Sequence, residues 1–228
     1  MSTDTGIIET QDGSHSLHST AFDAAYHSHY GAIQESQHVF LTAGLEHICP
    51  HYETIRVFEM GFGTGLNALL TWLAADEWSK SIYYESVELA PISLTQASQL
   101  NYPELLGTPP DKFLQLHEKD WNQIHPLSPF FNFKKIEGKL QDIEIGSDFN
   151  VVYYDAFAPG TQPELWEAPV FEKLYRSMSP EAVLVTYCAK GIVKRCLKSI
   201  GFQVEAIPGP PGKREMIRAT RPTTVTPC

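Results

Sequence analysis

Glu59-Met-Gly-Phe-Gly-Thr-Gly65 is the stretch that decides the fold, because three alternating glycines directly follow a segment with the character of a β-strand. That segment, Ile55-Arg-Val-Phe-Glu59, is short and apolar and ends at the glycines, which predicts a buried strand. Residues 66 to about 75 carry helix formers with apolar spacing, so a helix is expected directly after the loop. Strand, glycine loop and helix in this order are typical of a crossover unit. Its glycines permit a sharp turn and the close approach of a ligand.

Strand and helix patterns alternate along the rest of the chain. Further strands are expected at 82–88, 133–145, 150–155, 182–187, 202–207 and 216–219, and helices at 91–100, 164–178 and 191–200. The last two strands flank the turn-rich segment 208–212, which predicts an antiparallel hairpin on the edge of the sheet. The sequence therefore predicts an α/β fold with a doubly wound, mainly parallel sheet and a C-terminal antiparallel hairpin.

The length of 228 residues suits one sizeable α/β domain. We expect this domain over 51–228, preceded by an N-terminal hairpin and helical extension over 1–50. Asp12-Gly13 is the hairpin signal within 6–20, and a helix is expected between 21 and about 49. Residues 101–133 contain five prolines and are expected to form an irregular insertion whose Leu and Phe side chains are buried.

Several classes of protein are disfavoured by composition. The N-terminal Met-Ser-Thr-Asp-Thr lacks the features of a signal peptide, and no stretch approaches the ~18 apolar residues of a membrane span. The four cysteines lie far apart, which suits reduced thiols in a cytoplasm, and the nine histidines lack the spacing of metal ligands. We therefore expect a cytoplasmic protein with neither a membrane span nor a bound metal.

Charge is distributed unevenly along the chain. Residues 188–228 hold eight Lys or Arg against two Glu, a net charge of +6, which leaves −16 for the rest of a chain whose total is −10. Such a split indicates either a polyanionic partner or a solvated helix face, and charge alone does not separate the two.

The acidic residues around the glycines favour one cofactor over another. Glu88 ends the second strand, where its carboxylate can accept both hydroxyls of an adenosine ribose. A dinucleotide site needs a third glycine at position 66, which is Leu66. A carboxylate at Glu59 would repel a pyrophosphate but suits the ammonium of a methionine moiety. The pattern predicts that the glycine loop binds S-adenosylmethionine rather than a nicotinamide dinucleotide. The alternative is that the loop is a tight turn with no ligand-binding role.

Asp155-Ala-Phe-Ala-Pro159 is a second constellation and follows a predicted strand directly. Ligands of a doubly wound sheet bind beyond the carboxyl ends of its strands, so Asp155 is expected to point into the cofactor crevice. Phe157 offers an aromatic face for stacking. The structural alternative, an Asp that caps the next helix, is disfavoured because that helix is expected several residues later.

Five blocks in the same order carry a resemblance to a known family. They are Tyr30-Gly-Ala-Ile-Gln-Glu-Ser-Gln-His-Val-Phe40, Phe58-Glu-Met-Gly-Phe-Gly-Thr-Gly-Leu-Asn67, Tyr154-Asp-Ala-Phe-Ala-Pro159 with Pro163-Glu-Leu-Trp166, Tyr187-Cys-Ala-Lys-Gly191, and Gly209-Pro-Pro-Gly-Lys-Arg-Glu-Met216. Over nearly its whole length the chain resembles the methyltransferase that completes 5-methylaminomethyl-2-thiouridine at the wobble position of transfer RNA. In many bacteria this domain is fused to a flavin-dependent oxidase. No flavin-binding segment is present, so the monofunctional form is expected.

The resemblance implies a class I, Rossmann-like methyltransferase that uses S-adenosyl-L-methionine. It implies transfer of the methyl group to the aminomethyl nitrogen at position 5 of uridine 34 in the anticodon stem-loop of transfer RNA. It also implies a functional link to the enzymes that make the aminomethyl group. Two alternatives are a methyltransferase for a small amine and a non-catalytic, cofactor-binding partner subunit.

The expected site residues follow from the motifs and the resemblance together. Asp155 is the candidate catalytic residue, which would hydrogen-bond the amine and orient its lone pair. The expected cofactor-binding residues are Glu59, Met60, Gly61, Gly63, Thr64, Gly65, Asn67, Glu88, Leu140, Asp155 and Phe157. The expected substrate-binding residues are Tyr30, Glu35, Lys190, Lys194, Lys198, Lys213 and Arg214. Lys139 stands where such enzymes usually carry an acid near the adenine, so backbone groups around Lys139 and Leu140 are expected to make that contact.

Overall fold

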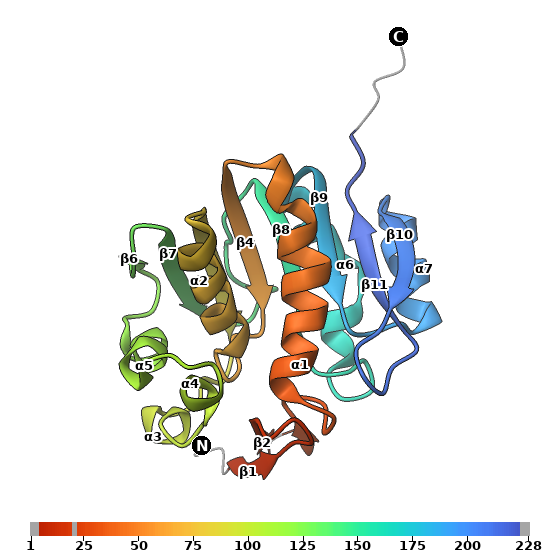
Figure 1. The fold of residues 1–228 in the computed structure, drawn as a ribbon. Helices are drawn as coiled ribbons and strands as arrows, with labels where there is room; N and C mark the ends of the chain where they lie inside the picture. Colours follow the sequence, from red (N-terminus) through yellow and green to blue (C-terminus); the bar gives the residue numbers. More distant parts are fainter. Residues whose placement is uncertain (1–4, 20–21, 224–228) are drawn as a thin grey trace.

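The computed structural model describes residues 5–19 and 22–223, and its centre is an eight-stranded sheet with the order β10-β11-β9-β8-β4-β5-β7-β6 (Figure 1). Its parallel strands include β4 (Thr54–Met60), β5 (Ser81–Glu88), β7 (Phe131–Glu137), β8 (Phe149–Tyr154) and β9 (Met178–Thr186). The antiparallel pairs involve β6 (Ile124–Pro126), β10 (Gln203–Pro208) and β11 (Glu215–Thr220). The predicted α/β class, the doubly wound sheet and the C-terminal hairpin are confirmed. The hairpin places β11 between β9 and β10, so β10 alone forms that edge.

Helices cover both faces of the sheet because the central strands are apolar on both sides. Along β4, Ile55 and Val57 pack into one core, while Phe58 and Met60 pack into the other. The first face carries α1 (Ala32–Ser36), which continues as the helix η1 (Gln37–Glu46), together with α2 (Leu66–Trp78). The second carries α6 (Ala168–Ser177) and α7 (Gly191–Ile200), which lie behind the sheet in Figure 1.

The N-terminal residues form a small three-stranded sheet of β1 (Thr5–Glu9), β2 (His15–Ser19) and β3 (Ala24–Ala25). The hairpin predicted around Asp12-Gly13 is confirmed, and Asp12 accepts the backbone N–H of Ser14 at 2.9 Å within its turn. The long helix of α1 and η1 crosses the main sheet closely, since an added Cβ at Gly44 would lie 3.0 Å from Val185. This helix is thus part of the layer over β8 and β9, and the short helix η2 (Cys49–His51) follows it.

Residues 101–133 are more regular than the sequence suggested. They contain α4 (Tyr102–Leu105), α5 (Pro110–Glu118) and β6, so the expectation of an irregular insertion was wrong. The buried side chains of Phe113 and Leu116 place α5 against the first face of the sheet. The boundaries proposed for the insertion and for the N-terminal extension stay predictions.

Three predicted elements have different bounds. The strand expected at 133–145 ends at Glu137, because Gly138 takes a φ of +152° and its N–H bonds the Glu88 carbonyl. The helix expected at 91–100 is the single turn α3 (Leu94–Ala97), capped by Ser93. The helix expected at 164–178 is divided into η3 (Pro163–Trp166) and α6.

Some expectations fall on parts of the chain that are not described. The N-terminal Met-Ser-Thr-Asp, the end of the hairpin segment at Thr20, and Cys228 lie outside the described residues. Within the described ranges, Cys49, Cys188 and Cys196 are free thiols. Those same ranges contain no helix whose length and apolar character would let it cross a bilayer.

Candidate active site

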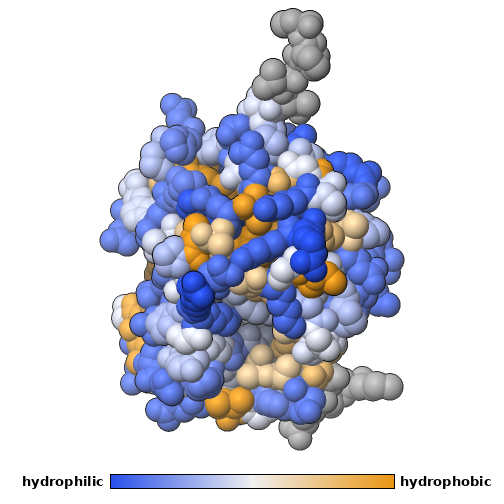
Figure 2. Space-filling view, turned by 90° about the vertical axis from the view of Figure 1, so that its right-hand side faces the viewer, coloured by the Kyte–Doolittle hydropathy of each residue, from blue (hydrophilic) through white to orange (hydrophobic). Residues whose placement is uncertain are grey.

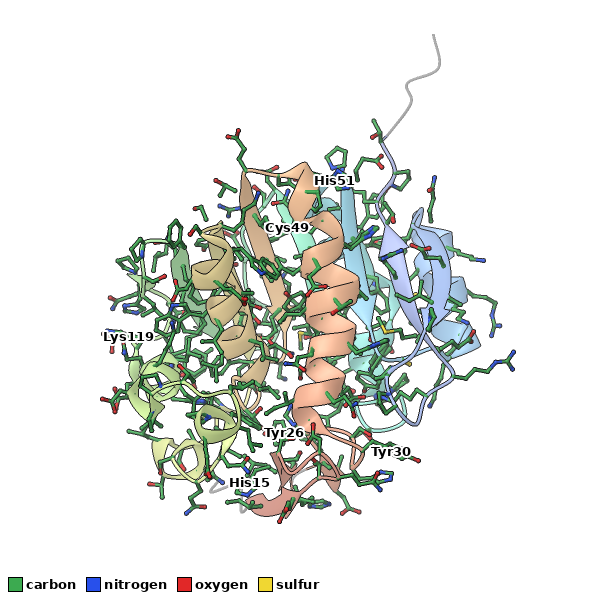
Figure 3. The ribbon with its side chains drawn as sticks, viewed as in Figure 1. His15, Tyr26, Tyr30, Cys49, His51 and Lys119 are labelled. Atoms are coloured by element: carbon green, nitrogen blue, oxygen red, sulfur yellow. The ribbon has the colours of Figure 1, made fainter. Side chains whose placement is uncertain are left out.

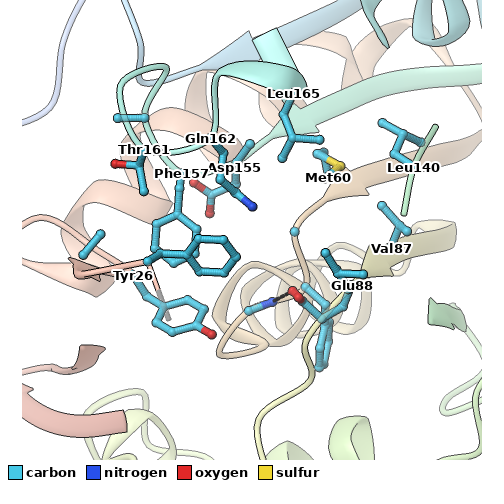
Figure 4. Close-up of a pocket in the computed structure, with 18 of the residues that line it drawn as sticks. Tyr26, Met60, Val87, Glu88, Leu140, Asp155, Phe157, Thr161, Gln162 and Leu165 are labelled. Carbon is cyan, nitrogen blue, oxygen red and sulfur yellow. Dashed lines mark hydrogen bonds between the residues drawn. The ribbon is translucent and has the colours of Figure 1, made fainter. Parts of the chain in front are cut away.

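A cavity of about 500 Å³ lies at the carboxyl ends of β4, β5, β8 and β9, where a doubly wound sheet binds its ligands. Further wall residues come from other parts of the chain: Phe22 and 24–28 of the N-terminal region, Glu35 of α1, residues 138–142 after β7, several residues within 161–165, and Lys213 of the turn between β10 and β11. Figure 4 shows Tyr26 and Phe157 on one side and Val87, Glu88 and Leu140 on the other. The volume falls within the range of roughly 300–1,000 Å³ that small-molecule and cofactor sites occupy.

The glycine loop forms one wall of the cavity with its backbone. Gly61 and Gly63 have φ angles of +90° and +51°, a region in which glycine alone is free of a steric penalty. The N–H of Gly61 donates to the Val87 carbonyl at 3.1 Å, which ties the loop to the end of β5. An added Cβ at Gly61 would approach the Asp155 carbonyl oxygen to 2.9 Å, so glycine is needed here for the strand ends to meet.

Glu88 lies where a carboxylate can receive a ribose. Its Oε2 accepts the N–H of Gly63 at 2.9 Å, and its Oε1 accepts the N–H of Ala90 at 2.8 Å. An ionised carboxylate has about four acceptor sites, so each oxygen retains one for a ligand hydroxyl. The residues present therefore fit an adenosine group at this end of the cavity.

Glu59 lies below the loop and does not line the cavity. Its side chain is fully buried, and its Oε2 accepts the Ser86 hydroxyl at 2.6 Å. Burial, reinforced by the nearby Asp155, raises the pKa of the Glu59 carboxyl to about 8. A neutral, buried Glu59 is not placed to receive a methionine ammonium directly, and a cofactor-binding role for it stays a prediction.

Asp155 follows β8 and points into the cavity, as Figure 4 shows. Its Oδ2 accepts the Asn67 side-chain amide at 2.9 Å, which joins the end of β8 to the start of α2. Burial, followed by the charge of Glu35, raises the pKa of Asp155 to about 7, although the Asn67 hydrogen bond and Lys213 act in the opposite direction. A carboxyl group with this pKa can both accept and release a proton near neutral pH.

The loop after Asp155 is held in place by side chains from later elements. The Trp166 indole donates to the Phe157 carbonyl at 2.7 Å, and the Tyr187 hydroxyl donates to the Ala156 carbonyl at 2.8 Å. The Tyr154 hydroxyl bonds the carbonyl of Leu165. These bonds satisfy loop carbonyls that would otherwise be left buried without donors, so the position of Asp155 is fixed by a rigid support.

An aromatic wall stands beside Asp155. The Phe157 ring centroid lies 5.0 Å from that of Phe22 and 5.1 Å from that of Tyr26. Tyr26 also covers the glycine loop, since an added Cβ at Gly63 would lie 3.1 Å from its ring. The N-terminal segment therefore contacts both the glycine loop and the Asp155 loop.

The opposite side of the Asp155 loop carries a charged pair. Lys213 Nζ lies 2.6 Å from Glu35 Oε1 and 4.1 Å from the centre of the Tyr187 ring. Glu35, Lys213 and Tyr187 all line the cavity. The two charged residues come from distant parts of the sequence, and only the packing of the long helix beside the β10–β11 hairpin brings them together.

The structure brings most of the predicted site residues into one place. Those that line the cavity are Glu35, Met60, Gly61, Gly63, Thr64, Asn67, Glu88, Leu140, Asp155, Phe157 and Lys213. Among the described residues, the predicted ones that do not line it are Tyr30, Glu59, Gly65, Lys190, Lys194, Lys198 and Arg214. Their assignments stay predictions.

Apart from Glu59 and Gly65, the predicted residues outside the cavity lie on the side of the molecule that carries α7 and the β10–β11 hairpin. Tyr30 packs against the β10–β11 turn, where an added Cβ at Gly212 would overlap its ring. Figure 3 shows Tyr26 and Tyr30 on opposite sides of the lower end of the long helix. Lys194 is engaged in an ion pair with Glu215 at 2.6 Å, whereas Lys198 is exposed on the same helix.

Sequence reasoning missed several residues of the cavity. Tyr187 directly follows β9, as Asp155 follows β8, so the strand-end rule that located Asp155 could have found it. Tyr26 and His27 carried no such signal, because they reach the cavity only through the folding of the N-terminal sheet over it. Asp142 also lines the cavity beyond Lys139 and Leu140, where the adenine contact is expected. Within the described ranges, no cluster of three or more His, Cys, Asp or Glu is arranged to hold a metal ion.

Comparison with known proteins agrees with this geometry. Residues 131–222 match the family described as S-adenosyl-L-methionine-dependent methyltransferase. The chain is 33% identical over 218 residues to the tRNA 5-methylaminomethyl-2-thiouridine biosynthesis bifunctional protein MnmC of Cupriavidus necator, a match that covers 89% of this chain and 32% of the relative. It is 30% identical to the protein of the same name from Azoarcus sp., covering 88% of this chain and 33% of that relative. The chain thus spans about a third of the length of these curated relatives.

Solved structures show the same fold. MNMC2 from Aquifex aeolicus superposes with a TM-score of 0.80 at 23% identity, covering 99% of this chain and 73% of that chain. S-adenosylmethionine-bound CalS10, an amino pentose methyltransferase from Micromonospora echinaspora, gives a TM-score of 0.51 at 12% identity, covering 84% and 92%. The fold, the cavity and the sequence matches agree, and the chain belongs to the family of S-adenosyl-L-methionine-dependent methyltransferases that includes the matched part of the MnmC proteins.

Proposed function

We propose that this chain transfers a methyl group from S-adenosyl-L-methionine to the aminomethyl nitrogen at position 5 of uridine 34 in transfer RNA, forming 5-methylaminomethyl-(2-thio)uridine. The observation that carries the proposal is the carboxylate of Asp155, held by Asn67 in a cavity that it shares with the glycine loop. The matched relatives are named for the biosynthesis of this nucleoside, which favours a uridine aminomethyl group as the acceptor. The enzyme would work in the cytoplasm, after the enzymes that install the aminomethyl group.

The cofactor supplies an activated methyl group on a sulfonium, which any well-placed neutral amine can attack. Glu88 would hold the adenosine ribose, and the backbone of Gly61 and Gly63 would border the methionine part. Backbone around Lys139 and Leu140 would contact the adenine. These residues would bind the cofactor and orient its methyl group. Alignment of two reactants alone can lower the activation barrier by roughly 7–11 kcal/mol.

The residues of the chain must also handle one proton. A primary alkylammonium has a pKa of about 10, judging by lysine, so the acceptor arrives charged and without a lone pair. Asp155 would accept an N–H proton on its Oδ1, because its Oδ2 is engaged by Asn67. The N–H bond breaks, a carboxyl O–H bond forms, and the freed lone pair of nitrogen is directed at the methyl group.

A basic edge on the C-terminal side is our candidate for the docking of transfer RNA. We define this basic edge as Lys190, Arg195, Lys198 and Arg214, which are all exposed and take part in no ion pair among the described residues. Lys190 follows Tyr187 by three residues, and Arg214 follows Lys213, so both ends of the edge approach cavity-lining residues. Figure 2 shows the face that carries α7 and the β10–β11 hairpin, which is largely hydrophilic with apolar areas between.

The test is methyl transfer in vitro with labelled S-adenosyl-L-methionine. The substrates are transfer RNA with an aminomethyl group at uridine 34, the same transfer RNA without it, and a free small amine. Nucleoside mass analysis should find one added methyl group on the wobble nucleoside of the first substrate alone. Equal methylation of the free amine would favour a small-molecule methyltransferase, and cofactor binding without any transfer would favour a non-catalytic subunit.

A further inference from the structure

The ion pair of Glu35 and Lys213 is built into the wall of the cavity and is not a surface contact. The side chains of Glu35 and Lys213 are 11% and 32% exposed, and their charged atoms are 2.6 Å apart. Both residues line the same cavity as Asp155. A pair so placed is shielded from water and salt far more than a surface pair, so its charges act strongly on their neighbours.

Both partners are held in position by further contacts. Glu35 Oε2 accepts the backbone N–H of Ser28 at 2.9 Å. The ammonium of Lys213 lies over the Tyr187 ring at 4.1 Å, and the hydroxyl of that same tyrosine bonds the Ala156 carbonyl at 2.8 Å. The lysine is thereby fixed relative to the backbone beside Asp155. A lysine held in this way is not available for a phosphate of the RNA.

Asp155 is surrounded by ionisable groups from five other parts of the fold. These groups are Glu35 of α1, Lys213 of the β10–β11 turn, Tyr187 directly after β9, Glu59 of β4 and Tyr84 of β5. Burial raises the pKa of Glu59 to about 8 and holds that of both tyrosines well above its usual range. Near neutral pH the remaining charges that face Asp155 are therefore those of Glu35 and Lys213.

We propose that Lys213 and Glu35 are positioning residues that set the charge of Asp155. Lys213 engages the carboxylate of Glu35, so that Asp155 rather than Glu35 takes the proton of the acceptor. The part of this inference that concerns proton transfer from the acceptor rests on the proposed function. The effect of Glu35 and Lys213 on the ionisation of Asp155 does not. Two unpaired carboxylates would attract an ammonium and hold a proton between them, as like charges in one site do. Lys213 offsets the charge of Glu35, so Asp155 can ionise and then accept the proton when the amine arrives.

The experiment follows the ionisation of Asp155 directly in the full chain without any substrate. Carboxyl ¹³C resonances are titrated between pH 5 and pH 9, and that of Asp155 is assigned by its loss in Asp155→Asn. Glu35→Gln removes the negative neighbour and keeps the cation, so the midpoint of Asp155 should fall by about half a pH unit or more. Lys213→Met should raise the midpoint, Lys213→Arg should leave it near that of the wild type, and the Glu35→Gln/Lys213→Met double variant should fall between the single variants.

A matched control uses a second ion pair of the same length. Lys194 and Glu215 are also 2.6 Å apart but do not line the cavity, so Glu215→Gln should leave the Asp155 midpoint unmoved. An unmoved midpoint in Glu35→Gln, or an upward shift, would overturn the inference.

The pH dependence of kcat/KM for methyl transfer then separates the inference from the proposed function. Its acidic limb should shift with the Asp155 midpoint in each variant. If the Asp155 midpoints shift but the protein does not methylate aminomethyl transfer RNA, the role of Glu35 and Lys213 is supported and the proposed substrate is rejected. Normal methyl transfer with unshifted Asp155 midpoints would support the proposed substrate and reject the charge-setting role of Glu35 and Lys213.

Discussion

Asp155 is the residue at which the chemistry can be tested most directly. Asp155→Asn keeps the shape and the contact with Asn67 but removes the proton acceptor, so turnover should fall by roughly 100- to 10,000-fold. The affinity for S-adenosyl-L-methionine should change little, because Glu88 and the glycine loop would carry that contact. Single-turnover rates and calorimetry measure the two quantities. A near-normal single-turnover rate would show that Asp155 has only a structural role.

Gly63 can be tested against a glycine with the same backbone but no ligand nearby. Gly63 and Gly107 have φ angles of +51° and +63°, so alanine should destabilise the fold at either position by about 1 kcal/mol. An added Cβ at Gly107 meets nothing within 4 Å, whereas Gly63 lines the cavity and its added Cβ would lie 3.1 Å from the Tyr26 ring. Calorimetry should therefore show weaker S-adenosyl-L-methionine binding in Gly63→Ala alone. Equal affinities of the two variants for S-adenosyl-L-methionine would show that the glycine loop is not part of the cofactor site.

The residues of the cavity differ in how far the sequence could predict them. Glu88 ends β5 and Asp155 directly follows β8. Because the carboxyl ends of parallel strands meet at one edge of the sheet, the order of the sequence was enough to place both residues there. Lys213 and Tyr26 reach the cavity only through the positions of the terminal hairpins, which no local pattern encodes. Glu59 was predicted to face a ligand. However, strand alternation directs it into the core on the side of Val57, opposite to Met60.

At the scale of the element, β4 ends in a buried carboxyl group whose ionisation opposes folding. The pKa of Glu59 is raised from 4.5 to about 8, so between these values the folded chain holds a proton that the unfolded chain has lost. Its contribution to stability therefore falls as the pH rises from about 4.5 to about 8, by at most about 1.4 kcal/mol per pH unit. Glu59→Gln has no such proton. When the free energy of unfolding is measured with urea, the wild type should therefore lose stability relative to this variant as the pH rises from 5 to 8.

The difference between the two proteins isolates Glu59, because other buried groups titrate as well. Burial lowers the pKa of His27 to about 4, so the contribution of His27 increases with pH and opposes that of Glu59. This background is shared by both proteins and cancels. Parallel stability curves would show that Glu59 is ionised in the folded chain.

Element boundaries could be predicted where a single sequence signal marked them. The predictions were wrong near prolines, because proline can either interrupt a helix or begin one. Pro103 and Pro110 were read as breakers, but each lies in the first turn of a helix, where the missing N–H has no partner to lose. β4, β5 and β8 were located to within one residue because their apolar runs end in glycine or acid. The strand after Phe131 was extended too far, since nothing in its composition marked Gly138 as the turn.

At the scale of the whole molecule, the uneven charge of the sequence is partly cancelled by folding. Lys194, Lys213 and Arg218 of the basic C-terminal segment pair with Glu215, Glu35 and Glu205. Of these, Glu35 belongs to the acidic body, so the segment is joined to the rest of the molecule through a charge pair. Five basic residues of the segment form no ion pair within the described ranges. Four of them make up the basic edge, and the fifth, Arg221, bonds the Met178 carbonyl. A polyanion would be repelled by the acidic body and attracted to this edge.

The basic residues of α7 should therefore contribute unequally to the binding of transfer RNA, because only some of them belong to the basic edge. Lys198 is exposed and forms no ion pair with any residue that the structure describes, whereas Lys194 is already engaged by Glu215. Each phosphate contact that is lost lowers the slope of log affinity against log salt by roughly 0.7–0.9. The double variant Arg195→Ala/Lys198→Ala should weaken binding and flatten this slope, and Lys194→Ala should do so less, with S-adenosyl-L-methionine affinity unchanged in both. Lys119→Ala, on the opposite side of the molecule in Figure 3, is the matched control. If the double variant and this control give the same affinity and slope, α7 is only a solvated face and the RNA docks elsewhere.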